Sequence, residues 1–224
     1  MRKGFWLLEL IFAIVVMAIA MLSIPTVLSQ TTAGIETTLK QEAIFYGSRT
    51  MGSLLTYRWD ENSIKGDPDK NISHILDVSN GDSHFDRNTS ITPSRFRTGN
   101  FNLKAVRTFF NTTTNATSTL GNESGESEKD DIDDFNNDTD IITAQKGDFV
   151  LNMKIHKKIY YIADTPTYSN GRVRFSFSST SASPTTNVKM IELNVTDDKD
   201  NTILLIRTIT CNVGEPTPQT VHKG

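Results

Sequence analysis

The hydrophobic and polar positions divide the chain into three regions, and the first is an apolar block. Residues 5–28 are almost continuously apolar. The few interruptions are Glu9, Ser23, Pro25 and Thr26. A helix of 24 residues measures roughly 36 Å, enough to cross a hydrocarbon core of about 30 Å. We therefore expect a transmembrane segment at 5–30, behind the basic stub of residues 1–4.

The next stretch keeps apolar residues at steps of three and four, which is the spacing of one helical face. These residues are Ile35, Leu39, Ala43, Tyr46, Thr50, Leu54 and Tyr57. The pattern predicts that 31–58 is the amphipathic lower half of the same long helix, with its apolar stripe packed on a sheet. A separate helix lying on the membrane is the alternative, but the polar face is not especially basic.

The second region, 59–147, is rich in Asn, Asp, Ser and Thr and keeps no steady period. We interpret it as a polar, variable connection between helix and sheet, with short strands near 101–106. The run 111–117, Asn-Thr-Thr-Thr-Asn-Ala-Thr, is typical of a mobile surface excursion.

Strand patterns fill the third region, 148–224. The expected strands are 148–155, 158–163, 172–178, 188–195 and 202–210. The last two flank a polar turn at 197–201 that suits a hairpin. One long helix followed by such strands predicts an α+β fold, with the helix packed on a C-terminal antiparallel β-sheet.

Glu9 is the unusual residue of the apolar block. A carboxylate deep in a bilayer costs about 2.5–3.5 kcal/mol on insertion scales, so it needs a partner or a function. An ordinary secretory signal, with a cleavage-like Ala18-x-Ala20, is the alternative interpretation. Glu9 and the continuation of the apolar run to Leu28 argue against it.

The residues Lys-Gly-Phe-Trp-Leu-Leu-Glu-Leu at 3–10, running into an apolar helix, resemble the class III signal of type IV pilins and type II secretion pseudopilins. That resemblance implies cleavage by prepilin peptidase after Gly4 and methylation of Phe5. It implies that Glu9 meets the N-terminal amine of a neighbouring subunit, and that Pro25 kinks the helix. The implied partners are the peptidase, other pilin or pseudopilin subunits and the inner-membrane assembly machinery.

The resemblance also implies a location. Arg2 and Lys3 would hold the N-terminus in the cytoplasm, with the C-terminal domain in the periplasm, so the chain would be a single-pass protein of the inner membrane before it enters a pilus or pseudopilus. The expected function is that of a minor pilin or pseudopilin. A major pilin, a single-span anchored periplasmic sensor or binding module, and a secreted enzyme are the alternatives.

An acidic run at 123–140 holds more carboxylates than a loop needs. Oxygen ligands suit Ca²⁺, and we name Asp131, Asp133, Asp134 and Asp138 as candidate ligands of an irregular site. The ligand pattern is not that of an EF-hand, and a solvated charge run is the plainer alternative. The core of this run, at 130–135, is similar to a stretch in some minor pilins of the mannose-sensitive haemagglutinin type.

Three Asn-x-Ser/Thr triplets carry an acid two residues before the Asn, which resembles the acceptor of bacterial N-glycosylation. They are Asn71, Asn88 and Asn194.

The net charge of −3 and the scattered Lys and Arg residues indicate no nucleic acid partner. The sequence lacks the Gly-x-Ser-x-Gly nucleophile elbow, the phosphate-binding P-loop and the Cys-x-x-Cys motif, so we do not expect an enzyme. The single cysteine, Cys211, is expected to be buried.

Overall fold

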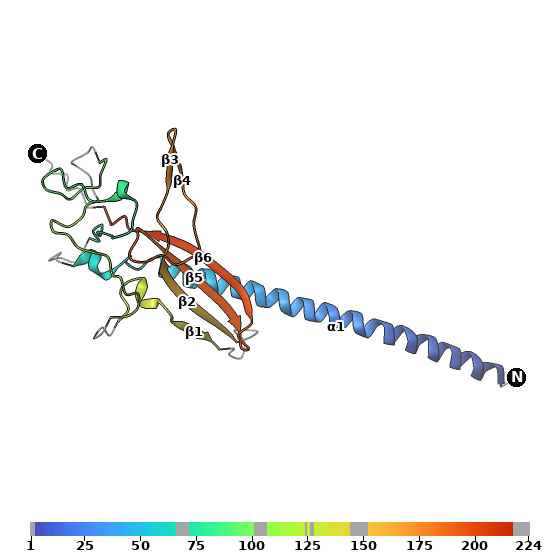
Figure 1. Cartoon of the computed structure of the whole chain (residues 1–224). Coiled ribbons are helices and arrows are strands. Elements are labelled where there is room, and N and C mark those ends of the chain that lie inside the picture. Colours follow the sequence, from blue (N-terminus) through green and yellow to red (C-terminus); the bar gives the residue numbers. More distant parts are fainter. Residues whose placement is uncertain are drawn as a thin grey trace, which may run out of the picture.

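The computed structural model describes residues 3–65, 72–100, 107–123, 125, 128–143 and 152–216. One long helix leads into a globular part built on an antiparallel sheet, so the expected α+β fold is confirmed (Figure 1). The elements are α1 (Lys3–Leu54), η1 (Glu61–Ile64), η2 (Ser83–Phe85), η3 (Asp133–Phe135), β1 (Thr139–Ile142), β2 (Met153–Tyr161), β3 (Thr167–Ser169), β4 (Arg172–Arg174), β5 (Val188–Asp197) and β6 (Thr202–Cys211).

Helix α1 is a single element of 52 residues, as the two consecutive periodic patterns predict. Its lower half buries one face against the sheet through Ala43, Met51 and Leu54. The helix ends at Leu54, four residues before the predicted end. Beyond this point the hydrogen bonding is of the 3₁₀ type: the N–H of Tyr57 donates to the carbonyl of Leu54, three residues back, at 3.2 Å.

The main sheet has the order β1-β2-β5-β6, and every neighbouring pair is antiparallel. The predicted hairpin of the last two strands is confirmed, with Asp197 Oδ1 accepting from the N–H groups of Lys199 and Asn201 in its turn. The separate strands predicted at 148–155 and 158–163 are wrong. They belong to one strand, β2, because the polar side chain of Lys157 is buried under the edge strand and does not mark a turn.

Two further strands depart from the pattern. β1 lies inside the region expected to be a polar connection, and β3 had no prediction. The predicted strand 172–178 is shortened to Arg172–Arg174, which pairs with β3 in a separate two-stranded hairpin. Cys211 is exposed, contrary to the expectation of burial, because it ends the edge strand β6. The strands expected near 101–106 and the residues 148–151 lie outside the described chain.

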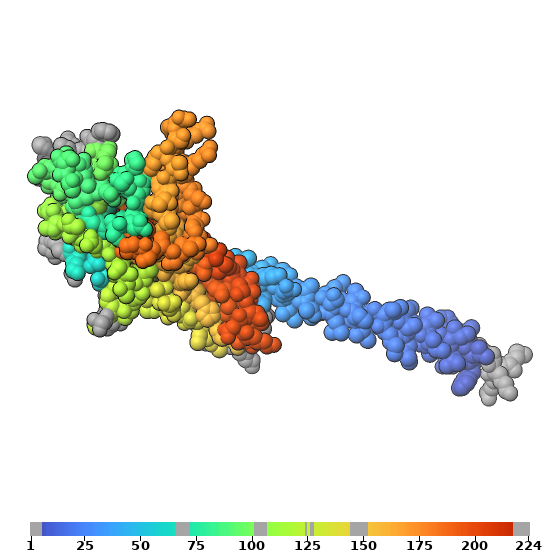
Figure 2. Space-filling view, in the orientation of Figure 1, coloured from blue at the N-terminus to red at the C-terminus, as the bar shows by residue number. Residues whose placement is uncertain are grey.

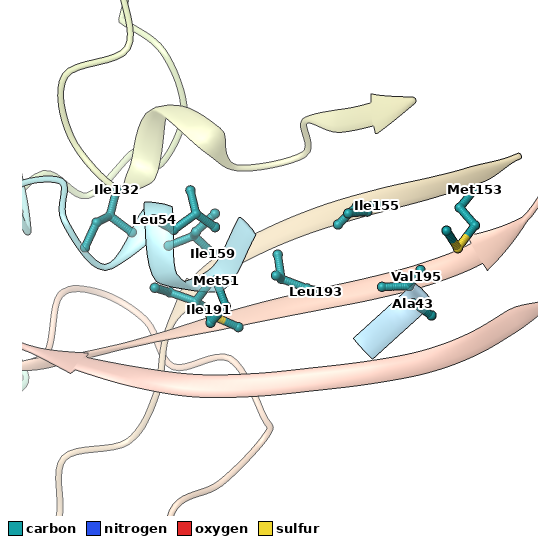
Figure 3. Packing of buried hydrophobic residues seen from close by; sticks show 10 residues of the cluster. All are labelled: Ala43, Met51, Leu54, Ile132, Met153, Ile155, Ile159, Ile191, Leu193 and Val195. Atoms are coloured by element: carbon teal, nitrogen blue, oxygen red, sulfur yellow. The ribbon is translucent and has the colours of Figure 1, made fainter. Parts of the chain in front are cut away.

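The main core lies between α1 and one face of the sheet (Figure 3). Side chains from the helix meet alternate residues of β2 and β5, and one residue of the acidic run closes the end of the core. The ten buried members are Ala43, Met51, Leu54, Ile132, Met153, Ile155, Ile159, Ile191, Leu193 and Val195. Alternation along the two central strands therefore decides which face receives the helix.

The polar region between helix and sheet is a folded lobe, and the run 111–117, expected to be a mobile surface excursion, lies mostly exposed on its surface. The centre of this lobe is a half-buried ion pair in which Arg87 donates to both carboxylate oxygens of Asp77, at 2.9 and 2.6 Å. Arg87 also donates to the carbonyls of Ser94 and Phe110, both at 2.6 Å. The backbone of Thr114 pairs with Asp77 as well. Part-buried polar bonds thus hold this lobe together in place of a periodic apolar pattern.

The contact between helix and sheet is closest at Gly47. A Cβ atom there would lie 2.7 Å from Cδ1 of Ile206 and 3.4 Å from Cγ2 of Val195. We predict that a fragment of residues 31–224 folds without the apolar segment, and that Gly47→Leu lowers its unfolding free energy by about 1–3 kcal/mol through overpacking. Urea denaturation followed by circular dichroism measures the difference.

The matched control is Gly52→Leu, on the same helix, where nothing lies within 4 Å of the Cβ position. This variant should keep or raise the stability, since leucine is the better helix former. Equal losses in the two variants would contradict the packing described here.

Candidate assembly segment and acidic cluster

The first half of α1 stands clear of the globular part (Figure 2). Every described side chain from Trp6 to Thr37 is exposed, including large apolar ones such as Phe12 at 63% and Leu22 at 77%. The helix is long enough and apolar enough to cross a membrane. The protein's own fold therefore leaves this surface to be covered by something else, either lipid or another chain.

Glu9 is exposed within this apolar surface. Gly4 and Phe5 lie in the first turns of α1. Helix α1 continues through Pro25, so the proline removes one backbone donor without ending the helix. The fold brings Glu9 near no described basic group of its own chain, and the nearest ion pair on the helix is that of Glu36 with Lys40, at 2.9 Å.

The acids of the predicted calcium site bind backbone amides. Asp131 Oδ1 accepts from the N–H groups of Asp133 and Asp134, at 2.9 and 3.2 Å, and its Oδ2 accepts from that of Glu61 at 2.5 Å. Asp134 Oδ2 accepts from the N–H groups of Asp130 and Asp131, at 2.9 and 3.1 Å. These carboxylates fix the short helix η3 and join it to the segment that follows α1.

A buried ammonium group lies beside them. Lys189 enters from β5, with its side chain fully buried, and its Nζ lies 2.5 Å from Asp133 Oδ1 and 3.4 Å from Asp60 Oδ2. It also donates to the carbonyl of Trp59 at 2.6 Å and lies 4.3 Å from the centre of that indole ring. One cation thus joins the end of α1, the acidic run and the sheet. We call this group of residues, with Asp131 and Asp134, the Lys189 cluster.

Asp138, the fourth predicted ligand, belongs to another group. It accepts from Lys129 at 2.7 Å and from Lys157 at 3.0 Å. No set of three or more His, Cys, Asp or Glu side chains within the described residues is arranged to hold a metal ion. The calcium site stays a prediction, and the geometry supplies these acids with other partners.

The charge of the Lys189 cluster is unbalanced, because four buried carboxyl groups face one ammonium group. Burial raises the pKa of Asp133 to about 8 and that of Asp131 to about 6, although the positive charge of Lys189 opposes both shifts. Asp133 Oδ2 and Asp134 Oδ1 are buried without a hydrogen-bond partner in the described part of the chain. Retained protons reduce the repulsion among these acids.

The candidate glycosylation sites are scattered. Asn88 lies in the folded lobe, where its Oδ1 accepts from the N–H of Ser90 at 3.0 Å. Asn194 lies in β5, which is paired on both sides, and its Oδ1 is buried. Asn71 lies outside the described residues. Modification stays a prediction, and the position of Asn194 within a central strand does not favour it.

Sequence reasoning missed Asp60 and Lys189. The one available signal was a lysine between apolar residues in a predicted strand, Val-Lys-Met-Ile at 188–191. Comparison of the chain with protein-family models, curated proteins and solved structures gave no match. The inferences below therefore depend on the residues and their geometry.

The raised pKa values predict how stability depends on pH. In an unfolded chain Asp133 would titrate near its ordinary value of 3.8, so the folded state binds more protons between about pH 4 and pH 8. Stability should therefore be highest near pH 4–5 and should fall as the pH rises through 8. Asp133→Asn should remove most of this decline, which urea denaturation of the 31–224 fragment at pH 5 and pH 8 will measure.

Asp138→Asn is the matched control. Burial alone would raise the pKa of Asp138, but hydrogen bonds from Lys129 and Lys157 hold it at about 2. Its stabilising effect is present above pH 4 and is lost only as the pH falls through 2, so this variant should lose the same stability at pH 5 and pH 8. An unchanged decline in Asp133→Asn would disprove the proton-holding role.

Proposed function

We propose that this chain is a structural subunit, a minor pilin or pseudopilin, of a type IV pilus-like or type II secretion filament. The observation that carries the proposal is the first half of α1. It is apolar, it is exposed along its whole described length, it contains one acid, and it continues without a break into the helix that packs on the sheet. A filament formed by parallel packing of such helices would cover that surface.

Glu9 fits this role on energetic grounds. A carboxylate in a bilayer or in an apolar helix bundle is costly unless a cation neutralises it. The described part of the chain offers Glu9 no cation, so the partner has to come from the terminus or from another molecule. Cleavage after Gly4 would create a new amine on Phe5, and the amine of an adjoining subunit supplies the missing charge.

The proposal includes a topology, which is inferred from the same segment. With Arg2 and Lys3 held in the cytoplasm, the globular part would lie in the periplasm and the chain would span the inner membrane once. Prepilin peptidase and the inner-membrane assembly machinery would be its partners there. The large lobe between helix and sheet, and the single cysteine that excludes an intramolecular disulfide, favour a minor subunit over a major one.

Cleavage between Gly4 and Phe5 is the first test. Mass spectrometry of the protein from its host should show a mature chain that begins at Phe5 and carries a methyl group on its amine. A mature chain that begins at Met21 would show that the segment is an ordinary secretory signal, and an uncleaved chain would show that it is a plain anchor.

Glu9→Leu is the second test. Membrane insertion should be retained or improved, because a costly carboxylate is removed. Filament incorporation, measured by immunogold labelling in a strain without the native protein, should be lost.

The control is Glu36→Leu, which removes an exposed acid from the same helix outside the apolar block. Its pair with Lys40 is exposed to solvent and contributes little to stability, so assembly should be unaffected. Normal assembly of the Glu9→Leu chain would disprove the role of this acid.

A further inference from the structure

The Lys189 cluster holds an amine and a carboxyl group in direct contact, out of reach of water. Nζ of Lys189 lies 2.5 Å from Oδ1 of Asp133, and the two side chains are 0% and 1% exposed. Because Cγ of Asp133 is bonded to this oxygen, the nitrogen lies beside the carbon atom that an amide bond would join. The two groups are thus placed as reactants as well as an ion pair.

The carboxyl group of Asp133 is the electrophile in this arrangement. Its Oδ1 accepts from Lys189, its Oδ2 is buried without a hydrogen-bond partner in the described part of the chain, and no described backbone amide donates to either oxygen. Burial raises the pKa of Asp133 to about 8, against the positive charge of Lys189, so the group keeps its proton at neutral pH. An amine attacks a neutral carboxylic acid more readily than a carboxylate, because no negative charge repels its lone pair.

Asp60 lies beside the same nitrogen and can take a proton from it. Its Oδ2 is 3.4 Å from Nζ of Lys189. Backbone N–H groups of Asn62 and Thr117 donate to its two oxygens, at 3.0 and 2.9 Å, so its carboxyl group is held in place. A general base must lie within reach of the proton that it removes, and Asp60 meets this requirement.

Aromatic side chains enclose the amine. Nζ of Lys189 lies 4.3 Å from the ring centre of Trp59 and 5.3 Å from that of Tyr161. The hydroxyl of Tyr161 donates to the carbonyl of Thr117 at 2.7 Å and so does not compete for the reacting groups. Fixed reactants reach effective concentrations of about 10⁵–10⁸ M. A closed site also keeps out the water that would hydrolyse the product.

We propose that Lys189 and Asp133 condense after folding into an intramolecular amide, an isopeptide bond between β5 and η3. Asp60 takes one proton from the ammonium group, and the freed lone pair of Nζ bonds to Cγ of Asp133. The bond from Cγ to Oδ2 then breaks, and a second proton from the nitrogen joins the hydroxyl group, which leaves as water. The nitrogen keeps its third hydrogen, one proton stays on Asp60, and no other reactant is consumed.

This bond would close a loop that spans 56 residues and contains β1 and β2. Closing a long loop reduces the conformational entropy of the unfolded chain and so stabilises the fold. The inference goes beyond the proposed function and does not depend on it, because every reacting group belongs to one chain. The pH dependence predicted for Asp133 is that of the unreacted chain, since an amide has no carboxyl group to titrate.

Peptide mapping of the full chain, purified in detergent, denatured and digested with trypsin, tests the bond. Trypsin cleaves after Lys and Arg but not after a lysine whose amine is in an amide. The expected product is therefore a branched peptide in which 130–146 is joined to 175–199, uncut at Lys189 and lighter by one water than the sum of the two. Fragmentation in the mass spectrometer should place the branch on Asp133.

Two results of this digest would overturn the proposal. Recovery of only the separate peptides 130–146 and 175–189 would show that the ion pair does not react. A branch that joins 175–199 to 59–65 would make Asp60 the acceptor in place of Asp133. The unaltered chain decides the question, so the result does not depend on whether a variant folds.

The same digest contains a matched control. Lys157 also has a buried side chain, and its Nζ lies 3.0 Å from Asp138 and 2.6 Å from Asp140, but these acids are 32% and 45% exposed. Water reaches this pair, so it should remain ionic and trypsin should cleave after Lys157. A branch at Lys157 in equal yield would show that such links form during preparation, and would overturn the proposal.

Asp60→Asn tests the proton carrier, because it leaves both reacting groups in place. The fraction of branched peptide should fall by at least about tenfold, since a positioned base contributes about 10²–10⁴-fold to such a step. Circular dichroism checks that this variant is folded. An undiminished branch in the folded variant would overturn the role of Asp60, and the peptide map of the unaltered chain would still decide the bond itself.

Discussion

The buried ammonium group of Lys189 is the interaction on which the globular part depends. It joins residues that are far apart in the chain, because Asp60 lies 129 residues away and Asp133 lies 56 residues away. Removing one member of such a group would leave an unpaired charge in the core, which is strongly destabilising. The cluster therefore determines where the helix, the acidic run and the sheet meet.

This constraint explains how the helix can serve two environments. Its lower half is held at the end by Trp59 and Asp60, which contact Lys189, and along its length by the apolar core and the close approach of Gly47 to the sheet. The upper half needs none of these contacts. The domain can thus fold with one half of the helix as its own core element, while the other half remains free for lipid or for neighbouring helices.

The parts of the fold that sequence predicts are those with local signals. The apolar block, the helical stripe and the hairpin of β5 and β6 are each specified within a few dozen residues. The lobe and β1 were missed, because their order comes from side-chain bonds of Asp77, Arg87 and Lys157, and such bonds leave no periodic pattern in the sequence. Among the candidate functional residues, Glu9 can be recognised from sequence because it interrupts an apolar run. Lys189 and Asp60 cannot, because their ion pair forms only when the folded sheet brings them together.

The carboxylates of this chain lie in two contrasting environments, the folded globular part and the exposed apolar helix. In the globular part the buried acids accept hydrogen bonds from backbone amides or pair with a lysine. Where the pKa is raised, as at Asp133, a bound proton removes the charge. The fold itself therefore offsets the free-energy cost of burying them. Glu9 is given nothing by the described chain, although it lies in the most apolar segment. The same physical requirement, that a carboxylate away from water needs a positive partner, thus builds the fold in one place and leaves Glu9 to be neutralised by a group outside the described chain in the other. That contrast is the physical reason for our proposal that the N-terminal helix serves assembly in addition to anchoring the chain.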